Sequence, residues 1–297
     1  MHLDSDGFVT RAAALTAGYS DNEFTRLATR GDIRRVTTGI YLPRDVYDAQ
    51  SATQLHRLRA VATVRGRRDH SVSHVSAAVM HGLTMWNTDL TAVHLTAARA
   101  TGGRRSRELH VHTGRADELV STIGTTPVTS LARTVVDTAR WVDLDHAVVI
   151  GDSALRSGSV GPADLDVVLE HSARLHNIAA ARRAVSRMNA LSESAGESLS
   201  RLRMADHGMP APELQYTIPH LGFRVDFFWR QLRTVGEFDG MGKYGGRPEQ
   251  LAAEKTREDA MRDDGYEVFR WVWKDLWNFA EVVMRFERAR ARALLTR

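Results

Sequence analysis

The chain has 297 residues, of which 43% are hydrophobic and 26% charged, and its formal net charge is +4. This length allows two or three domains, and the composition is that of an ordinary globular protein rather than a disordered or fibrous one. The absence of cysteine excludes a disulfide framework and a thiolate site, and it agrees with a cytoplasmic location. No run of about 18 apolar residues occurs, so we expect no membrane partner. The mild positive charge permits a nucleic-acid partner but does not argue for one by itself.

The N-terminal stretch is organised as helix, glycine, helix and two short strands. A helical pattern over 8–17 is followed by a second pattern over 21–29, which Ser20 is placed to cap and Gly31 to end. Two short strands over 33–42 then surround a Thr-Gly turn. This order is the plan of a winged helix-turn-helix domain.

The same stretch, with its Arg35-x-x-x-Gly-x-Tyr41 motif, resembles the N-terminal domain of AbiEi-type antitoxins. The resemblance implies a winged helix over residues 1–50 that binds duplex DNA, with its second helix in the major groove. The residues expected to contact DNA are Asn22, Thr25 and Arg26 in the helix, and Arg30, Arg34 and Arg35 at phosphates. The alternative is a small packing domain whose arginines are merely solvated.

Residues 51–191 are interpreted as a mixed α/β middle domain. The motifs Ser73-His-x-Ser-Ala-Ala and Val128-Thr-Ser-x-Ala-Arg-Thr-x-x-Asp137 are similar to the middle region of AbiEi-like proteins. Histidines are frequent here, but no cysteine joins them and no His-x-x-x-His pair with a helical Glu occurs. We therefore interpret them as packing or surface residues: His70, His74, His81, His94, His110 and His112.

The last hundred residues have the order α-β-β-β-α-β-α. Two strand patterns rich in β-branched and aromatic residues are separated by three residues, which predicts a β-hairpin. The expected elements are a helix over 196–205, strands over 213–218, 223–229 and 233–239, a helix over 249–264, a strand over 267–273 and a final helix to residue 295.

Three acidic residues interrupt the apolar pattern of this hairpin. Glu237 and Asp239 alternate along one strand and so share a face, which Asp226 on the neighbouring strand can also reach. Carboxylates this close repel one another and are costly to bury unless a cation neutralises them. Because oxygen ligands suit Mg²⁺ or Mn²⁺, we predict a metal site. The alternative is an exposed acidic sheet edge, with Lys255 paired to Asp259 on the next helix.

Five motifs of this segment, taken in order, resemble the PD-(D/E)XK nuclease superfamily, in the branch similar to very-short-patch-repair endonucleases. They are Gly196-Glu-Ser-x-x-Arg, Arg224-Val-Asp-Phe, Glu237-Phe-Asp-Gly, Glu254-Lys-x-Arg-Glu-Asp and Gly265-Tyr-Glu-Val-x-Arg. The resemblance covers residues 192–297 and implies an αβββαβ restriction-endonuclease-like fold. The whole chain is therefore expected to be α/β, of the α+β kind.

The resemblance also implies roles for the acidic residues. Asp226 matches the strand aspartate of the family, Glu237 the first acid of its E-x-K motif, and Glu197 the acid on the first helix. Asp239 departs from the pattern, because it stands where the family has the lysine. Related branches move this lysine to the following helix.

The following helix and the loop before it offer substitutes for that lysine. Lys255 is the first candidate and Lys243 the second, and Tyr244 in the same loop is a candidate DNA contact. In a catalytic protein, Asp226, Glu237 and Asp239 would hold the metal, with Glu197 completing the shell, and Lys255 would orient the attacking water or stabilise the transition state.

Two functions therefore follow as alternatives. The first is a Mg²⁺- or Mn²⁺-dependent DNA endonuclease or nickase that the winged helix targets. The second is a non-catalytic, antitoxin-like transcriptional autorepressor that keeps a relic nuclease fold and binds a cognate toxin or another protein. The retained acids favour the first alternative, and the missing lysine favours the second.

Overall fold

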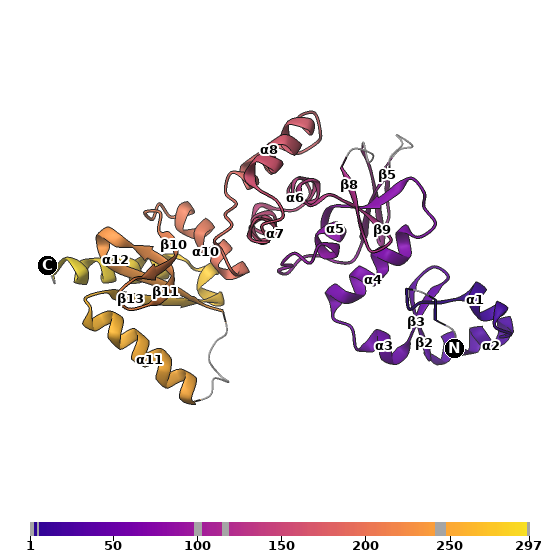
Figure 1. The fold of residues 1–297 in the computed structure, drawn as a ribbon, viewed down its shortest axis with the longest axis horizontal. Helices are drawn as coiled ribbons and strands as arrows, with labels where there is room; N and C mark the ends of the chain where they lie inside the picture. The colour runs from indigo at the N-terminus through magenta and orange to yellow at the C-terminus, as the bar shows by residue number, and fades with distance from the viewer. Residues whose placement is uncertain (1–2, 5, 98–102, 115–118, 241–247, 296–297) are drawn as a thin grey trace. The chain divides into compact units, whose positions relative to one another are not determined.

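The computed structural model describes the chain except residues 1–2, 5, 98–102, 115–118, 241–247 and 296–297 (Figure 1). Within the described residues the protein combines helices with three β-sheets, which confirms the α+β class. Where the sequence suggests three domains, the contacts group the chain into two compact units: residues 1–142 with 160–182, and residues 143–159 with 183–297. Among the described helices, none is both long and apolar enough to cross a membrane.

The first unit begins with a three-stranded antiparallel sheet, in the order β1-β3-β2, and three short helices. The elements are β1 (Val9–Thr10), α1 (Arg11–Thr16), α2 (Asp21–Arg30), β2 (Ile33–Thr37), β3 (Ile40–Pro43) and α3 (Arg44–Asp48). The predicted second helix is confirmed: Ser20 forms a capping box with Glu23, and Gly31 ends the helix at a φ of 76°.

The first predicted helix starts later than expected. Val9 and Thr10 form a strand, because Thr10 accepts the N–H of Ala13 at 3.1 Å and so caps a helix that begins at Arg11. Buried Phe24 of α2 packs in one cluster with Val9. The opposite side of α2 is left exposed.

The rest of the first unit is a six-stranded mixed sheet, in the order β6-β7-β5-β4-β9-β8, with helices packed against it. Its strands are β4 (His70–Val72), β5 (Val93–Ala97), β6 (Arg104–Arg105), β7 (Leu109–Thr113), β8 (Val120–Ile123) and β9 (Thr126–Thr129). Its helices are α4 (Ala52–Val64), α5 (His74–Met80), α6 (Leu131–Ala139) and α8 (Pro162–His171), while α9 (Ile178–Val185) spans the unit boundary. Val72, Leu95 and Val128 are fully buried at the centre of this sheet.

The second unit contains a four-stranded sheet in the order β10-β11-β12-β13, in which only the β12–β13 pair is parallel. Its elements are α7 (Leu144–Arg156), α10 (Ala195–Asp206), β10 (Glu213–Ile218), β11 (Phe223–Trp229), a 3₁₀ turn (Arg230–Leu232), β12 (Thr234–Asp239), α11 (Pro248–Asp263), β13 (Glu267–Val272), a second 3₁₀ turn (Trp273–Trp277) and α12 (Ala280–Leu295). The predicted order of elements over residues 195–295 is therefore the observed one.

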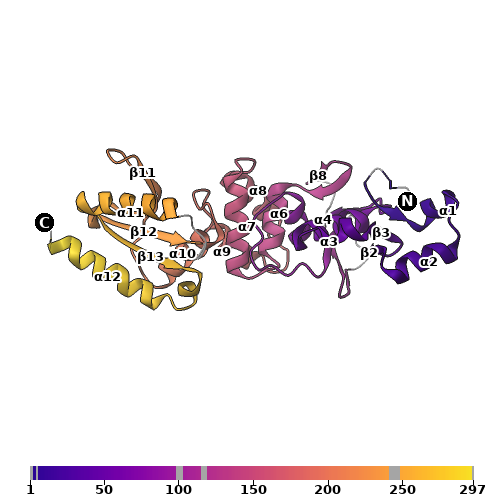
Figure 2. The ribbon, with the colours of Figure 1, turned by 90° about the horizontal axis from the view of Figure 1, so that it is seen from below.

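Apolar side chains hold helices on both faces of this sheet. Met261 of α11 packs in one cluster with Val235 and Val268, whereas Phe286 of α12 contacts the rings of Trp229 and Phe269. Figure 2 shows α11 and α12 on opposite sides of β12 and β13. The strands that carry the predicted acids therefore lie between two helical layers.

Helix α7 packs with α10 in the second unit, although the sequence places it in the middle domain. Asp152 of α7 is fully buried and pairs with Arg201 of α10 at 2.6 Å. Gly151 leaves room for the side chain of Met188, since a β-carbon there would lie 2.1 Å from its sulfur. Removal of one partner of this buried pair would be strongly destabilising, because it leaves a buried charge without compensation.

Candidate functional site

Asp226 lies on β11 and is bonded to the neighbouring strands on both sides. One carboxylate oxygen, Oδ2, accepts the backbone N–H of Phe238 on β12 at 3.0 Å. The other, Oδ1, accepts the side-chain amide of Gln215 on β10 at 3.3 Å. These contacts fix the carboxylate beside the end of β12, where Glu237 and Asp239 are located.

Gln215 is a site residue that the sequence interpretation missed. Its Nε2 donates to Glu197 Oε2 at 2.9 Å as well as to Asp226, so one amide connects two carboxylates. Its backbone has a φ of 51°, which is rare for a residue other than glycine and costs of the order of 1–3 kcal/mol. Strain of this kind persists where the surroundings require a particular side-chain direction.

Glu197 is buried in the first turn of α10, with 8% of its surface exposed. Its carboxylate accepts the hydroxyl of Ser194 at 2.8 Å and the backbone N–H of Glu193 at 2.8 Å, which caps the helix. Glu197 therefore reaches Asp226 through Gln215 and is not among the residues that line the cavity described below.

Among the described residues, no basic side chain forms an ion pair with Asp226. Burial, together with the negative charges of Glu197 and Glu237, raises the pKa of the Asp226 carboxyl to about 6 against the opposing hydrogen bonds from Phe238 and Gln215. Within the described residues, no lysine or arginine nitrogen lies within 4.0 Å of Asp226. This carboxylate is the group in the site whose ionised form a bound cation would stabilise most.

Glu237 has the opposite environment. It is buried, and its two carboxylate oxygens pair with Arg257 of α11 at 2.8 Å and with Arg270 of β13 at 2.7 Å. Arg270 also pairs with Glu254 and, at 3.3 Å, with Glu258, so it belongs to a network. The first acid of the predicted E-x-K motif is thus neutralised by two guanidiniums.

The acids and arginines line one cavity of about 220 Å³. The structure brings Asp226, Glu237 and Asp239 together there, as predicted from strand alternation. The lining comprises four carboxylates (Asp226, Glu237, Asp239, Glu254), three guanidiniums (Arg224, Arg257, Arg270), Gln215 and Phe238. The cavity therefore offers oxygen ligands for a cation together with guanidiniums that can bind an anion.

Lys255 does not line this cavity. It is exposed on α11, while Glu254, Arg257 and Glu258 of the same helix lie toward the sheet and take part in the ion-pair network. These positions are three and four residues apart and so share one side of the helix, a side that excludes Lys255. The alternative candidates Lys243 and Tyr244 lie outside the described residues.

The donor set fits a hard divalent cation. Asp226, Asp239 and Glu237 offer carboxylate oxygens, the ligands that Mg²⁺ and Mn²⁺ prefer. The fit is not complete in the state described, because both oxygens of Glu237 are held by arginines. Among the described residues, His74, His94 and His112 bring one ligand nitrogen each within 4.8 Å of one another. The sequence interpretation treats these histidines as packing or surface residues and does not foresee their convergence.

The N-terminal residues predicted to contact DNA lie on the surface, whereas the other two predicted contacts, Lys243 and Tyr244, lie outside the described residues. Asn22, Thr25, Arg26 and Arg30 are exposed on α2, and Arg34 and Arg35 are exposed on β2. Arg34 makes a 3.8 Å ion pair with Asp48, and Arg35 donates to the hydroxyl of Thr38 at 2.9 Å. Both pairs are solvent-exposed, so an incoming phosphate can replace these partners at little cost.

The sequence of the chain is similar to proteins of Mycobacterium tuberculosis. It is 31% identical over 240 residues to Uncharacterized protein MT2308 of strain CDC 1551 / Oshkosh, and equally to Uncharacterized protein Rv2248 of strain ATCC 25618 / H37Rv. The match covers 78% of this chain and 84% of each relative. The chain belongs to this family. Both relatives are uncharacterized, so the family assigns no activity.

Two further comparisons identify neither a family nor a function for the chain. No family model matches the chain. The crystal structure of the RV2827C protein from M. tuberculosis aligns with a TM-score of 0.40 and 14% identity, covering 63% of this chain and 78% of that one.

Proposed function

We propose that the chain is a DNA-binding protein whose C-terminal unit hydrolyses DNA phosphodiester bonds with Mg²⁺ or Mn²⁺. The observation that carries this proposal is the buried carboxylate of Asp226, with a pKa raised to about 6, beside Glu237 and Asp239 in a cavity that also contains three guanidiniums. A divalent cation would neutralise the acids, and the guanidiniums suit a phosphate group. A phosphodiester is a substrate that needs both kinds of group.

The cavity residues would divide the work between metal and phosphate. Asp226 and Asp239 would hold the ion, and Glu237 would join them after exchanging its arginine partners. When bound, the ion lowers the pKa of its water and offsets charge on the phosphate. Arg257 and Arg270, released from Glu237, would bind phosphate oxygens and stabilise the charge that develops in the transition state.

The order of elements in the second unit supports a restriction-endonuclease-like fold. A helix, a three-stranded antiparallel run, a helix and a parallel fourth strand follow one another over residues 195–272. The acids occupy the middle strands β11 and β12, as the resemblance to PD-(D/E)XK nucleases implies. The N-terminal helices and the β2–β3 hairpin support a winged helix that delivers this unit to DNA.

A second candidate function is a non-catalytic, antitoxin-like autorepressor with a protein partner. One observation favours it, namely the ion pairs of Glu237 with Arg257 and Arg270, which occupy the oxygens that a metal would need. In that case the arginine–glutamate network replaces the metal as the element that holds β12, β13 and α11 together.

Cleavage of supercoiled plasmid by the full chain with MgCl₂ or MnCl₂ tests the choice. We expect nicking by the wild type and losses of about 100-fold or more in Asp226→Asn and Glu237→Gln. Asp259→Asn is the matched control, because Asp259 is an exposed acid of α11 outside the cavity. A wild type that binds duplex DNA but cuts neither single- nor double-stranded DNA with either ion would establish the repressor instead.

A further inference from the structure

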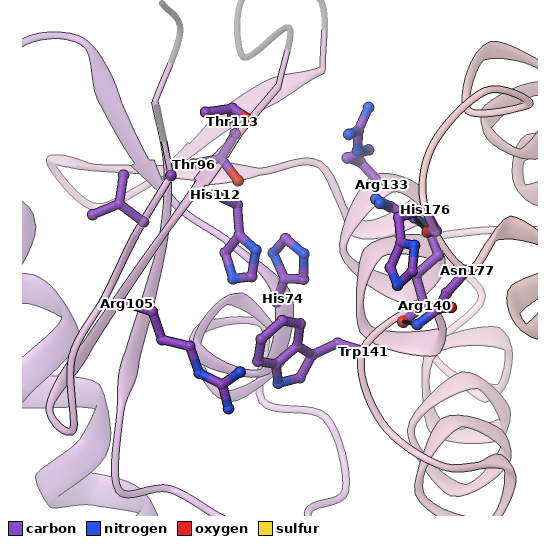
Figure 3. A pocket seen from close by; sticks show the side chains of 12 residues that line it. His74, Thr96, Arg105, His112, Thr113, Arg133, Arg140, Trp141, His176 and Asn177 are labelled. Atoms are coloured by element: carbon purple, nitrogen blue, oxygen red, sulfur yellow. Dashed lines mark hydrogen bonds between the residues drawn. The ribbon is translucent and has the colours of Figure 1, made fainter. Parts of the chain in front are cut away.

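A second cavity, of about 510 Å³, lies in the first unit and is lined by histidines and arginines. Figure 3 shows His74 and His112 side by side in it, with Trp141 next to them and Arg133, Arg140 and His176 on the opposite wall. The proposed hydrolysis uses none of these residues. Among the described lining residues there is no carboxylate.

Two histidines that line this cavity, His74 and His112, converge with His94 from a third element. His74 opens α5, His94 is on β5 and His112 is on β7, and one ring nitrogen of each lies within 4.8 Å of the others. His94 Nδ1 and His112 Nε2 are 3.0 Å apart, and the rings of His74 and His112 stack with centroids 3.6 Å apart. A tetrahedral zinc with bonds of about 2.0–2.1 Å needs its ligand nitrogens roughly 3.3 Å apart, so the nitrogens, which lie within 4.8 Å of one another, must draw together and the stacked rings must turn when an ion binds.

The three rings are shielded from solvent. His74 and His94 are buried, with 5% and 3% of their surface exposed, and His112 is half-buried beside them. A buried group of imidazole nitrogens is a ligand set typical of zinc sites.

Neighbouring groups orient the rings. Ser73 Oγ lies 3.0 Å from His74 Nδ1, which leaves His74 Nε2 as the nitrogen available to a ligand. His74 has a φ of 51°, an unfavourable conformation for a residue other than glycine, at the point where its ring turns toward the cavity. The edge of Trp141 packs against His94 and His112, at centroid distances of 5.2 and 4.9 Å.

We propose that His74, His94 and His112 form a binding site for a divalent transition-metal ion of the zinc class. Imidazole ligands select such ions over Mg²⁺ or Mn²⁺, and three protein ligands leave a coordination position open toward the cavity. The positive charges of Arg133 and Arg140 do not prevent an ion from binding, because buried Asp137 offsets them by pairing with both arginines, at 2.6 and 2.8 Å. The ion replaces the proton that His94 and His112 otherwise share in their hydrogen bond.

Titration of the EDTA-treated full chain with ZnCl₂ and with CoCl₂ tests the site. We expect one ion per chain, with visible absorption bands of tetrahedral cobalt and a higher Tm in zinc. His112→Gln keeps a hydrogen-bonding side chain of similar size and should weaken zinc binding by about 100-fold or more, beyond the usual loss for a residue that only supports a ligand.

Two control variants distinguish zinc bound at the three histidines from zinc bound elsewhere on the chain. His171→Gln removes an exposed histidine of α8, and Asp226→Asn alters the acid cavity of the second unit; both should bind zinc like the wild type. Equal zinc affinity and cobalt spectra in His112→Gln and the wild type would overturn the proposal. So would loss of the ion in Asp226→Asn. Should His112→Gln not fold, a wild type whose Tm and spectrum do not change with either ion would overturn it equally.

Discussion

The ring of Phe238 lies against Gly196 so closely that a β-carbon on the glycine would be 1.9 Å from ring atom Cε1. Gly196 is in the first turn of α10 and Phe238 is near the end of β12. The contact therefore packs the helix that carries Glu197 onto the strand that carries Glu237 and Asp239. The glycine of the Gly-Glu-Ser motif has a packing role that places the acid next to it.

Gly196→Ala should destabilise the protein, although alanine normally favours a helix over glycine. The added methyl would have to displace a large ring or the helix, and overpacking of this kind costs about 1–3 kcal/mol. Urea unfolding measures the change. Gly240→Ala is the matched control, because its β-carbon would meet the same ring at an ordinary 3.5 Å. Equal stability of the two variants would show that Phe238 moves aside freely.

Asp226→Asn should change how stability depends on pH when EDTA removes metal ions. The pKa of Asp226 is about 6 in the folded chain against an ordinary value of 3.8, so folding favours the protonated form. The contribution of the Asp226 carboxyl to the free energy of unfolding is fully present below pH 3.8 and is lost as pH rises through about 6. The difference is up to about 3 kcal/mol. Asp226→Asn has no carboxyl to ionise at this position, so its stability should rise relative to that of the wild type between pH 3.8 and about 6.

Urea unfolding of both proteins from about pH 4 to pH 7 measures this difference. Asp259→Asn serves as control for the loss of one acidic charge at an exposed position. Parallel profiles of Asp226→Asn and the wild type would mean that water or a neighbouring cation already compensates the carboxylate. Added MnCl₂ should stabilise the wild type and Asp259→Asn but not Asp226→Asn, since a ligand that binds only the folded state raises its stability.

The sequence predicts the parts of the site that strand alternation determines. Asp226, Glu237 and Asp239 meet because two adjacent strands present them at the same end of the hairpin. Gln215 could not be predicted in this way, because its positive φ takes the side chain out of the regular strand pattern. The convergence of His74, His94 and His112 could not be predicted for a different reason. They come from three elements of the sheet and its helix, and only the fold brings them together.

Arg34→Ala and Arg35→Ala should each weaken binding to all duplex sequences. Both arginines are exposed on β2 with replaceable partners, so we expect each to contact phosphate and its loss to reduce the salt slope by about 0.9 per contact. Arg26→Ala on α2 should instead alter sequence preference, by about 1–3 kcal/mol at the base it contacts.

Fluorescence anisotropy of labelled duplexes over a range of salt concentrations distinguishes the two effects. Arg174→Ala is a suitable control, because it removes an exposed arginine of the same unit outside the N-terminal elements. A salt slope identical in Arg34→Ala, Arg35→Ala and Arg174→Ala would remove β2 from the DNA interface.

Arg257, rather than Lys255, should be the basic side chain of α11 that supports hydrolysis. The sequence favours Lys255, because the E-x-K position holds Asp239, but Lys255 lies on the exposed side of α11. Arg257 lies on the side that faces the cavity and pairs with Glu237 at 2.8 Å. Lys255→Ala should therefore leave metal-dependent cleavage nearly unchanged, whereas Arg257→Ala should lower it by about 100-fold, the scale for one preorganised transition-state contact.

Duplex binding and Tm of both variants must be measured alongside cleavage, because Arg257 also bonds the backbone carbonyl of Arg224 and its loss exposes the charge of Glu237. Arg257→Lys separates the two roles: it keeps a positive charge for Glu237 but loses the forked geometry that binds phosphate. We expect this variant to recover stability more fully than cleavage. Loss of cleavage in Lys255→Ala, with Arg257→Ala close to the wild type, would return the role to the lysine and require α11 to turn on substrate binding.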